Sequence, residues 1–184
     1  MNGNFSGALI FLVNTLLGLY AMTILLRFLL QLVRADFYNP LSQFVVKVTN
    51  PLLRPLRRII PGAMGLDLAA LLLFYLVALI TVALLALIAG ATLPAAYLLW
   101  FALLKCIVIA IQLFFFTILI QVILSWVAQG WHPVAGALHA VNEPLLRPFR
   151  RLLPPLGGFD LSPLFAIILL QFLSFLIPLP PLFR

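Results

Sequence analysis

Four long apolar stretches alternate with shorter polar segments along this chain. They cover residues 8–33, 68–89, 95–127 and 161–179. A bilayer core of about 30 Å is crossed by roughly 20 apolar residues in helical form, so each stretch predicts a transmembrane helix. The third is long for a single crossing, which indicates a helix that tilts or projects from the bilayer. The fourth is the weakest, because Pro163 lies at its start and a Pro-x-Pro-Pro sequence closes it.

The composition favours a membrane protein over a soluble one. Of the 184 residues, 65% are hydrophobic and only 8% are charged, whereas soluble domains carry about 25% charged residues. So few charges cannot cover the molecule with a polar surface. The segment before the first apolar stretch has no Lys or Arg and no small-residue cleavage site follows it, so we expect the first span to remain as an anchor.

One basic phrase occurs twice. PLLRPLRRIIPG, which begins at Pro51, returns 93 residues later as PLLRPFRRLLPP, which begins at Pro144, and eleven of eighteen positions are identical between 51–68 and 144–161. This predicts two copies, residues 1–92 and 93–184, each a helix, a basic interfacial helix and a second helix. Each copy crosses twice, so the copies insert in parallel. The expected fold is an all-α membrane protein with four transmembrane helices.

The basic residues predict the orientation. Eight of the eleven Lys and Arg residues lie in the two connections that carry the repeated phrase, and the N-terminal segment and the turn at residues 90–94 have none. The positive-inside rule then places both connections in the cytoplasm and both termini outside.

Each repeated phrase is amphipathic. In the first copy we interpret Asn50 as an N-cap with Pro51 at the first helical position. Leu and Ile then share one face and the arginines the opposite face. This predicts a short helix, kinked at Pro55 or Pro148, with its apolar face toward the acyl chains and its arginines among phosphates. The candidate lipid- or partner-binding residues are Arg54, Arg57, Arg58, Arg147, Arg150 and Arg151.

Two interpretations of these arginines stay open. In the first, they set the topology and bind anionic headgroups, and each arginine contributes about 1 kcal/mol of binding free energy. In the second, the two arginine faces form a composite site for a phosphate-bearing partner or a protein. Nucleic acid is not expected, because the opposite apolar face commits the helix to membrane or protein. The prolines of each phrase are expected to begin, kink or end the helix, and the aspartate that follows is expected to cap the next helix or pair with an arginine. These residues form the structural motif: Pro51, Pro55, Pro61, Asp67, Pro144, Pro148, Pro154 and Asp160.

Polar residues inside the apolar stretches are further candidates: Arg27, Gln31, Lys105 and Gln112. Arg27 either snorkels to the headgroups or faces the bundle interior. Lys105 lies about 15 Å deep if its helix begins near Ala95, and close to the outer interface if the helix begins near Phe101. Neither charge recurs in the other copy.

Signals of catalysis are weak. The chain has four acidic residues, two histidines and no nucleophile or phosphate-loop motif, so an enzyme is not expected. The spacing of His132, His139 and Glu143 suits a metal site, but the first copy has no equivalent set. We therefore expect no metal and no cofactor. Cys106 is the only cysteine, so the chain forms no internal disulfide.

The segments Asp36–Pro61 and Asn142–Pro163 resemble the YggT family of small bacterial membrane proteins, and the resemblance spans nearly the whole chain. It implies a location in the bacterial inner membrane. It also implies a link to osmotic-stress tolerance, cation homeostasis or cell division, and plastid relatives are linked to organelle division and maturation of a b-type cytochrome. The resemblance implies no catalytic or ligand residues.

Three functions remain. The first is a non-enzymatic membrane scaffold or assembly factor, whose partners are anionic lipids and either a membrane protein or further copies of the chain. The second is an ion or small-solute transporter or channel component, and the third a cofactor-assembly factor or an unrecognised enzyme. The repeated amphipathic phrase and the absence of a catalytic motif favour the first. A hydrated cavity at Arg27 and Lys105 would favour the second.

Overall fold

The structure, a computed structural model, describes residues 3–36, 38–62, 65–127, 133–152 and 160–184. Within these ranges the chain is helical and has no strand. The elements are α1 (Gly3–Leu32), α2 (Pro40–Ile59), α3 (Leu68–Ile88), α4 (Ala95–Val127), α5 (Pro133–Leu152), α6 (Ser162–Leu176) and the short 3₁₀ helix η1 (Pro181–Phe183).

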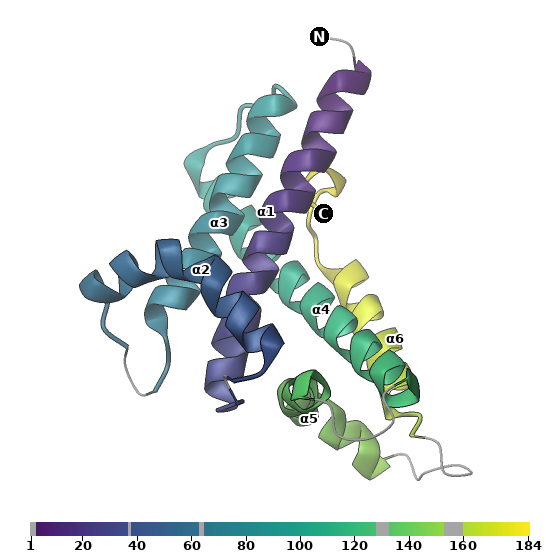
Figure 1. The fold of residues 1–184 in the computed structure, drawn as a ribbon. Helices are drawn as coiled ribbons and strands as arrows, with labels where there is room; N and C mark the ends of the chain where they lie inside the picture. The colour runs from purple at the N-terminus through teal and green to yellow at the C-terminus, as the bar shows by residue number, and fades with distance from the viewer. Residues whose placement is uncertain (1–2, 37, 63–64, 128–132, 153–159) are drawn as a thin grey trace.

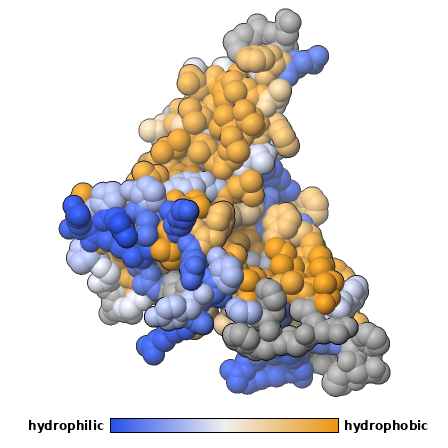
Figure 2. Space-filling model, viewed as in Figure 1, coloured by the Kyte–Doolittle hydropathy of each residue, from blue (hydrophilic) through white to orange (hydrophobic). Residues whose placement is uncertain are grey.

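Three helices, α1, α3 and α4, are long and apolar enough to cross a membrane. Apolar side chains lie on all sides of these helices, as in a membrane span, rather than on one face. Figure 2 shows this apolar surface over the upper part of the molecule. The fourth predicted span is shorter than expected, because α6 has 15 residues and ends at Leu176. At about 1.5 Å per residue it is roughly 22 Å long.

The helices of the two halves follow the same course. Figure 1 shows α1 and α4 descending and α3 and α6 ascending, with α2 at the left beside α1 and α3 and α5 at the lower end of the view, below α4. Both ends of α2 and α5 differ by the 93 residues of the sequence repeat. A duplicated sequence thus forms duplicated elements.

Two apolar clusters hold the halves together. In the first, Ile24 of α1, Leu53 of α2 and Val77 of α3 pack with residues of α4. In the second, Leu146 of α5 and Leu170 of α6 pack against α4. α4 contributes to both clusters and so joins the two halves, and a separate cluster of α1 and α5 residues joins them as well.

The N-terminal end of α2 differs from the prediction. The helix begins at Pro40, with Asn39 as its N-cap: Asn39 Oδ1 accepts a hydrogen bond from the backbone N–H of Ser42 at 2.8 Å. Pro51 therefore lies inside the helix, and Asn50 is not a cap. The helix continues through Pro51 because its buried side extends on both sides of this residue: Ser42, Val45, Thr49 and Leu53.

The apolar face of α2 packs mainly on protein rather than on acyl chains. Leu53 is fully buried, and Leu56 and Ile60 pack against the first cluster. Only the flanks remain free for lipid, with Leu52 and Ile59 exposed. The interfacial helix was predicted with this face toward lipid, whereas packing it against the bundle removes the same apolar surface from water and also fixes the helix to α1 and α3.

The segment after α6 returns to the bundle. Leu179 and Phe183 pack in a third cluster with Val82 of α3 and Leu104 of α4. Asn14 of α1 donates a hydrogen bond from Nδ2 to the carbonyl oxygen of Arg184 at 2.6 Å. The last eight residues therefore contact three helices far apart in the sequence.

Candidate functional site

An arginine–aspartate ion pair occurs at the same place in both halves. Arg57 of α2 binds Asp67, the N-cap of α3, through Nε at 3.1 Å and through Nη2. Arg150 of α5 binds Asp160 through Nε at 2.9 Å. This pair is equivalent to the first, because Arg150 and Asp160 lie 93 residues after Arg57 and Asp67, the spacing of the sequence repeat. Each pair ties a basic helix to the start of the helix that follows. Both aspartates also accept a backbone N–H there, Ala70 for Asp67 and Ser162 for Asp160.

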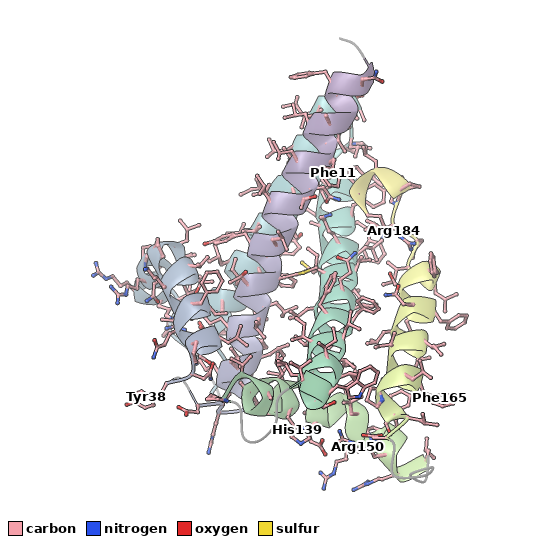
Figure 3. All side chains as sticks on the ribbon, turned by 45° about the vertical axis from the view of Figure 1, so that its right-hand side comes forward. Phe11, Tyr38, His139, Arg150, Phe165 and Arg184 are labelled. Carbon is pink, nitrogen blue, oxygen red and sulfur yellow. The ribbon has the colours of Figure 1, made fainter. Side chains whose placement is uncertain are left out.

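The second pair is part of a larger charged group. Arg150 also binds Glu143 through Nη1, and His139 Nε2 lies 3.6 Å from Glu143 Oε2. Figure 3 shows His139 and Arg150 near the lower ends of α4 and α6. Partial burial by itself raises the pKa of the Asp160 carboxyl, but hydrogen bonds from Ser162 and Arg150 outweigh it and hold this pKa below its ordinary value. Burial lowers the pKa of the Arg150 guanidinium, but its contacts with the Asp160 and Glu143 carboxylates outweigh this effect and raise that pKa.

The other four predicted arginines have a different environment. Arg54 and Arg58 on α2, and Arg147 and Arg151 on α5, are exposed, and within the described ranges none of them forms an ion pair with a carboxylate. The six arginines that the sequence grouped together therefore separate into two that hold the fold and four that face outward.

Arg27 connects α1 to α2 inside the protein. Its guanidinium donates from Nη1 to Thr49 Oγ1 at 2.6 Å, to Asn50 Oδ1 at 2.9 Å and to the carbonyl of Val46 at 3.4 Å. Its side chain faces the interior rather than snorkelling, and the residue is only 5% exposed. Gln31, one turn further along α1, accepts a hydrogen bond from Arg57 at 3.2 Å. Arg27 and Gln31 thus both bind α2.

In the second half, different residues attach the basic helix α5 to the preceding long helix α4. Thr117 of α4 donates to Asn142 Oδ1 at 2.8 Å, and Asn142 Nδ2 donates to Gln121 Oε1 at 2.8 Å. Asn142 takes the place of Thr49 under the 93-residue shift, and both are fully buried. Each basic helix is therefore attached to the preceding long helix by hydrogen bonds at one shared position.

Lys105 holds the C-terminal segment. Its Nζ donates to Asn14 Oδ1 and to the carbonyl of Phe183, both at 2.7 Å, and the residue is 3% exposed. Since α4 begins at Ala95, Lys105 lies about 15 Å along the helix from its first residue. Gln112 is half-buried and forms no side-chain hydrogen bond in the part of the chain that the structure describes.

The remaining predicted residues are placed as follows. Pro55, Pro144 and Pro148 lie inside α2 and α5, as Pro51 does, and Pro61 follows the extended C-cap of α2. Pro154 and His132 lie outside the described residues. His139 Nδ1 lies 3.3 Å from Gln121 Nε2. In the described ranges no three His, Cys, Asp or Glu side chains come together as a metal site would need.

Two open cavities lie beside the basic helices. One, of about 300 Å³, is lined by Gln31, Arg57, Gly62, Gly65, Leu66 and Asp67. The other, of about 340 Å³, is lined by Pro144, Arg147, Pro148, Arg151 and Leu152. Neither contains Arg27 or Lys105, whose charged groups bind protein atoms instead.

Sequence reasoning missed the acceptors of these buried cations. Thr49, Asn50 and Asn14 look like ordinary polar residues in the sequence. The contact between Lys105 and the Phe183 carbonyl joins positions 78 residues apart. The repeat contained one usable signal: Thr49 and Asn142 are polar at equivalent positions, four residues before the buried Leu53 and Leu146, on the helix side opposite the arginines.

Comparison with known proteins places the chain in a family. The CCB3/YggT family model matches residues 6–88 and 100–180. An uncharacterized protein of Pseudomonas aeruginosa is 49% identical over 173 residues, which are 92% of this chain and 88% of that protein. The uncharacterized protein YggT of Escherichia coli K12 is 43% identical over 167 residues, 90% of this chain and 87% of that protein.

A shorter match is to the YlmG homolog protein 2, chloroplastic, of Arabidopsis thaliana, 33% identical over 54 residues, which are 29% of this chain and 22% of that protein. No solved structure matches the chain. The family model covers both halves, and with them both ion pairs and both basic helices. This chain is a member of the CCB3/YggT family.

Proposed function

We propose that this protein is a non-enzymatic membrane factor, a scaffold or assembly protein whose two basic helices hold anionic lipid at one membrane face. The observation that carries the proposal is that α2 and α5 contact each other and present four exposed arginines that pair with no carboxylate among the described residues. Figure 2 shows the hydrophilic surface gathered over α2 and at the lower end of the view, below the apolar part. Arginines among phosphates at an apolar boundary are typical of interfacial helices.

The proposed topology follows from these charges. The positive-inside rule assigns α2 and α5 to the cytoplasmic face of a bacterial inner membrane and the N-terminus to the outside. We propose that α6 and the segment Ile177–Arg184 together complete a fourth crossing. At roughly 22 Å, α6 alone is shorter than a bilayer core of about 30 Å, and in Figure 1 the following segment continues upward along α1.

The intramembrane cations favour a scaffold over a transporter. A transport pathway needs polar groups that line a cavity open to water. Arg27 and Lys105 are buried and bind Thr49, Asn50, Asn14 and a backbone carbonyl instead. These bonds fix helices to one another, which is what a rigid platform requires.

In the cell, this platform would serve osmotic-stress tolerance or cell division, the roles that the resemblance to the YggT family implies. The partners proposed are anionic lipids together with a membrane protein or a second copy of the chain. Neither nucleic acid nor a cofactor is part of the proposal.

Native mass spectrometry in a lipid-preserving detergent tests the lipid-binding role. The wild type is compared with a variant that carries Arg54→Gln, Arg58→Gln, Arg147→Gln and Arg151→Gln, which leaves both ion pairs intact. We expect the variant to lose at least tenfold of its co-purified anionic lipid. A variant with Arg34→Gln and Lys47→Gln is the control for lost charge outside the arginine faces. Equal anionic lipid in the wild type and the four-arginine variant would contradict the proposal.

A further inference from the structure

Each acidic side chain of this protein has an observed contact, and none of these contacts is with Arg54, Arg58, Arg147 or Arg151. The sequence contains four Asp and Glu residues. Asp67 binds Arg57, and Glu143 and Asp160 bind Arg150. The last, Asp36, accepts the backbone N–H of Tyr38 at 2.9 Å in the turn after α1. An anion that neutralises the outward arginines must therefore come from another molecule.

Of the two outward pairs, only that of α5 lines a described cavity. Arg147 and Arg151 are one helical turn apart, and together with Pro144, Pro148 and Leu152 they line the cavity of about 340 Å³. Arg54 and Arg58 have the same spacing on α2, but the cavity near them is lined by Arg57 and Asp67, which neutralise each other. The two halves share the arginine phrase and differ in the space beside it.

The lining of this cavity has the chemistry of a phosphate group joined to an apolar chain. Two guanidinium groups four residues apart on a helix are neighbours, and each presents a planar fork of donors that matches phosphate oxygens. Pro144, Pro148 and Leu152 supply the apolar wall, and Leu152 is 79% exposed. A soluble phosphate would use the arginines and leave this apolar surface uncovered.

The two prolines also shape the site. A proline has no backbone N–H and a short ring in place of a longer side chain. With Pro144 and Pro148 one turn apart on the same side of α5, neither position places a long side chain between Arg147 and Arg151. The position of the cavity beside these two prolines agrees with this.

We propose that Arg147 and Arg151 form a headgroup site for one phosphate-bearing anionic lipid, and that the corresponding arginines of α2 form no such discrete site. The inference rests on the proposed lipid-binding function and assigns it to one half of the duplicated molecule. The two copies would then differ in function, because the repeated arginine motif forms a lipid-binding site in α5 and only a general basic surface in α2.

Titration of the purified protein with phosphatidylglycerol, followed by native mass spectrometry, tests this assignment. The affinity for the first lipid bound is compared between wild type, a variant with Arg147→Gln and Arg151→Gln, and the matched variant with Arg54→Gln and Arg58→Gln. We expect the α5 variant to weaken first-lipid binding by at least tenfold and the α2 variant by less than threefold. Thermal unfolding close to that of wild type verifies that both variants are folded.

Two further arms identify the ligand. A variant with Arg147→Lys and Arg151→Lys keeps both charges and removes the bidentate forks, so we expect an intermediate loss. Glycerol 3-phosphate, which has the phosphate without acyl chains, should displace the lipid only at far higher concentration. Displacement at a concentration similar to that of the lipid would overturn the assignment to a lipid.

Each pattern of the titration has a distinct meaning. Equal weakening in the α5 and α2 variants would overturn the asymmetric site. Unchanged binding in the α5 variant, together with loss in the four-arginine variant, would overturn this inference and leave the proposed function standing. Unchanged binding in all variants would contradict both.

Discussion

Arg27 Nη1 lies 2.6 Å from Thr49 Oγ1. The acceptors that the described residues provide for this cation of α1 are hydroxyl, amide and carbonyl oxygens of α2. A buried charge is stable only when its donors are satisfied. This contact therefore determines where α2 lies on α1. It also explains why a helix with two internal prolines stays in place beside the bundle.

Replacing Arg27 by Met should lower the free energy of unfolding by about 2 kcal/mol, because hydrogen bonds to a charged group contribute about 1.5–3 kcal/mol. The measurement is reversible unfolding in bicelles. The exposed Arg58, replaced in the same way, is the control and should change stability by less than about 0.5 kcal/mol. Similar effects of the two substitutions would show that the Arg27 contacts do not stabilise the docking of α2.

The two repeated ion pairs should differ in strength, because Asp67 is buried and Asp160 is not. Their side chains are 5% and 45% exposed. Asp67→Asn keeps an acceptor at the N-cap and weakens the bond to Arg57, so we expect a loss of about 1–2 kcal/mol. Asp160→Asn should cost less than about 1 kcal/mol, as solvent-exposed pairs do.

A double-mutant cycle with Arg57→Gln measures the first pair directly. The coupling between Arg57 and Asp67 should exceed that between Arg150 and Asp160 measured in the same way. The reverse order would mean that the contacts of Arg150 with both Glu143 and Asp160 outweigh the burial of Asp67.

The Asp160 pair should also make stability depend on pH in a defined direction. In the folded protein the pKa of Asp160 is held below its ordinary value of 3.8. A carboxyl with a depressed pKa stabilises the fold above its unfolded pKa and loses this contribution as pH falls through the folded pKa. The difference in unfolding free energy between wild type and Asp160→Asn should therefore be constant from pH 7 to about 4. Below about pH 4 it should become smaller, because protonation of Asp160 removes the contribution that only the wild type has.

Thermal unfolding midpoints from pH 7 to pH 2.5 provide the test. Both proteins contain Glu143 and His139, so the comparison isolates the change at residue 160. A difference that widens in acid would show that Asp160 is not the group whose ionisation stabilises this contact.

Lys105 should control whether the C-terminal segment stays attached. Lys105→Met leaves the carbonyl of Phe183 and Oδ1 of Asn14 without their donor, at a cost of about 1–3 kcal/mol. Backbone hydrogen exchange of residues 182–184 should then become at least tenfold faster, since 1.4 kcal/mol corresponds to a factor of ten. The matched control is Lys47→Met, which removes an exposed lysine of α2. Equal exchange in both variants would exclude a role for Lys105 in holding this segment.

Much of the architecture was predictable from the amino-acid sequence. The predicted third stretch, residues 95–127, is the range of α4, and α3 differs from its predicted range by one residue. These predictions succeed because a long apolar segment must satisfy its backbone hydrogen bonds within itself, which leaves the helix as its structure. The arginine faces were also visible, since their period is that of a helix.

The tertiary structure decided what local patterns left open. Asn39 and Asn50 each precede a proline, so both are plausible N-caps, and only the buried contacts through Leu53 extend α2 back to Pro40. The six arginines are alike in sequence, yet Arg57 and Arg150 bind aspartates at the start of the following helix. The arginines three residues before them and directly after them face outward. The partners of Lys105 come from α1 and from the last residues of the chain. The length of an apolar segment and the helical period of its side chains are local properties, which can be seen in any short stretch of the sequence. Charge pairing and burial depend on which distant segments meet, and this is settled only when the helices pack.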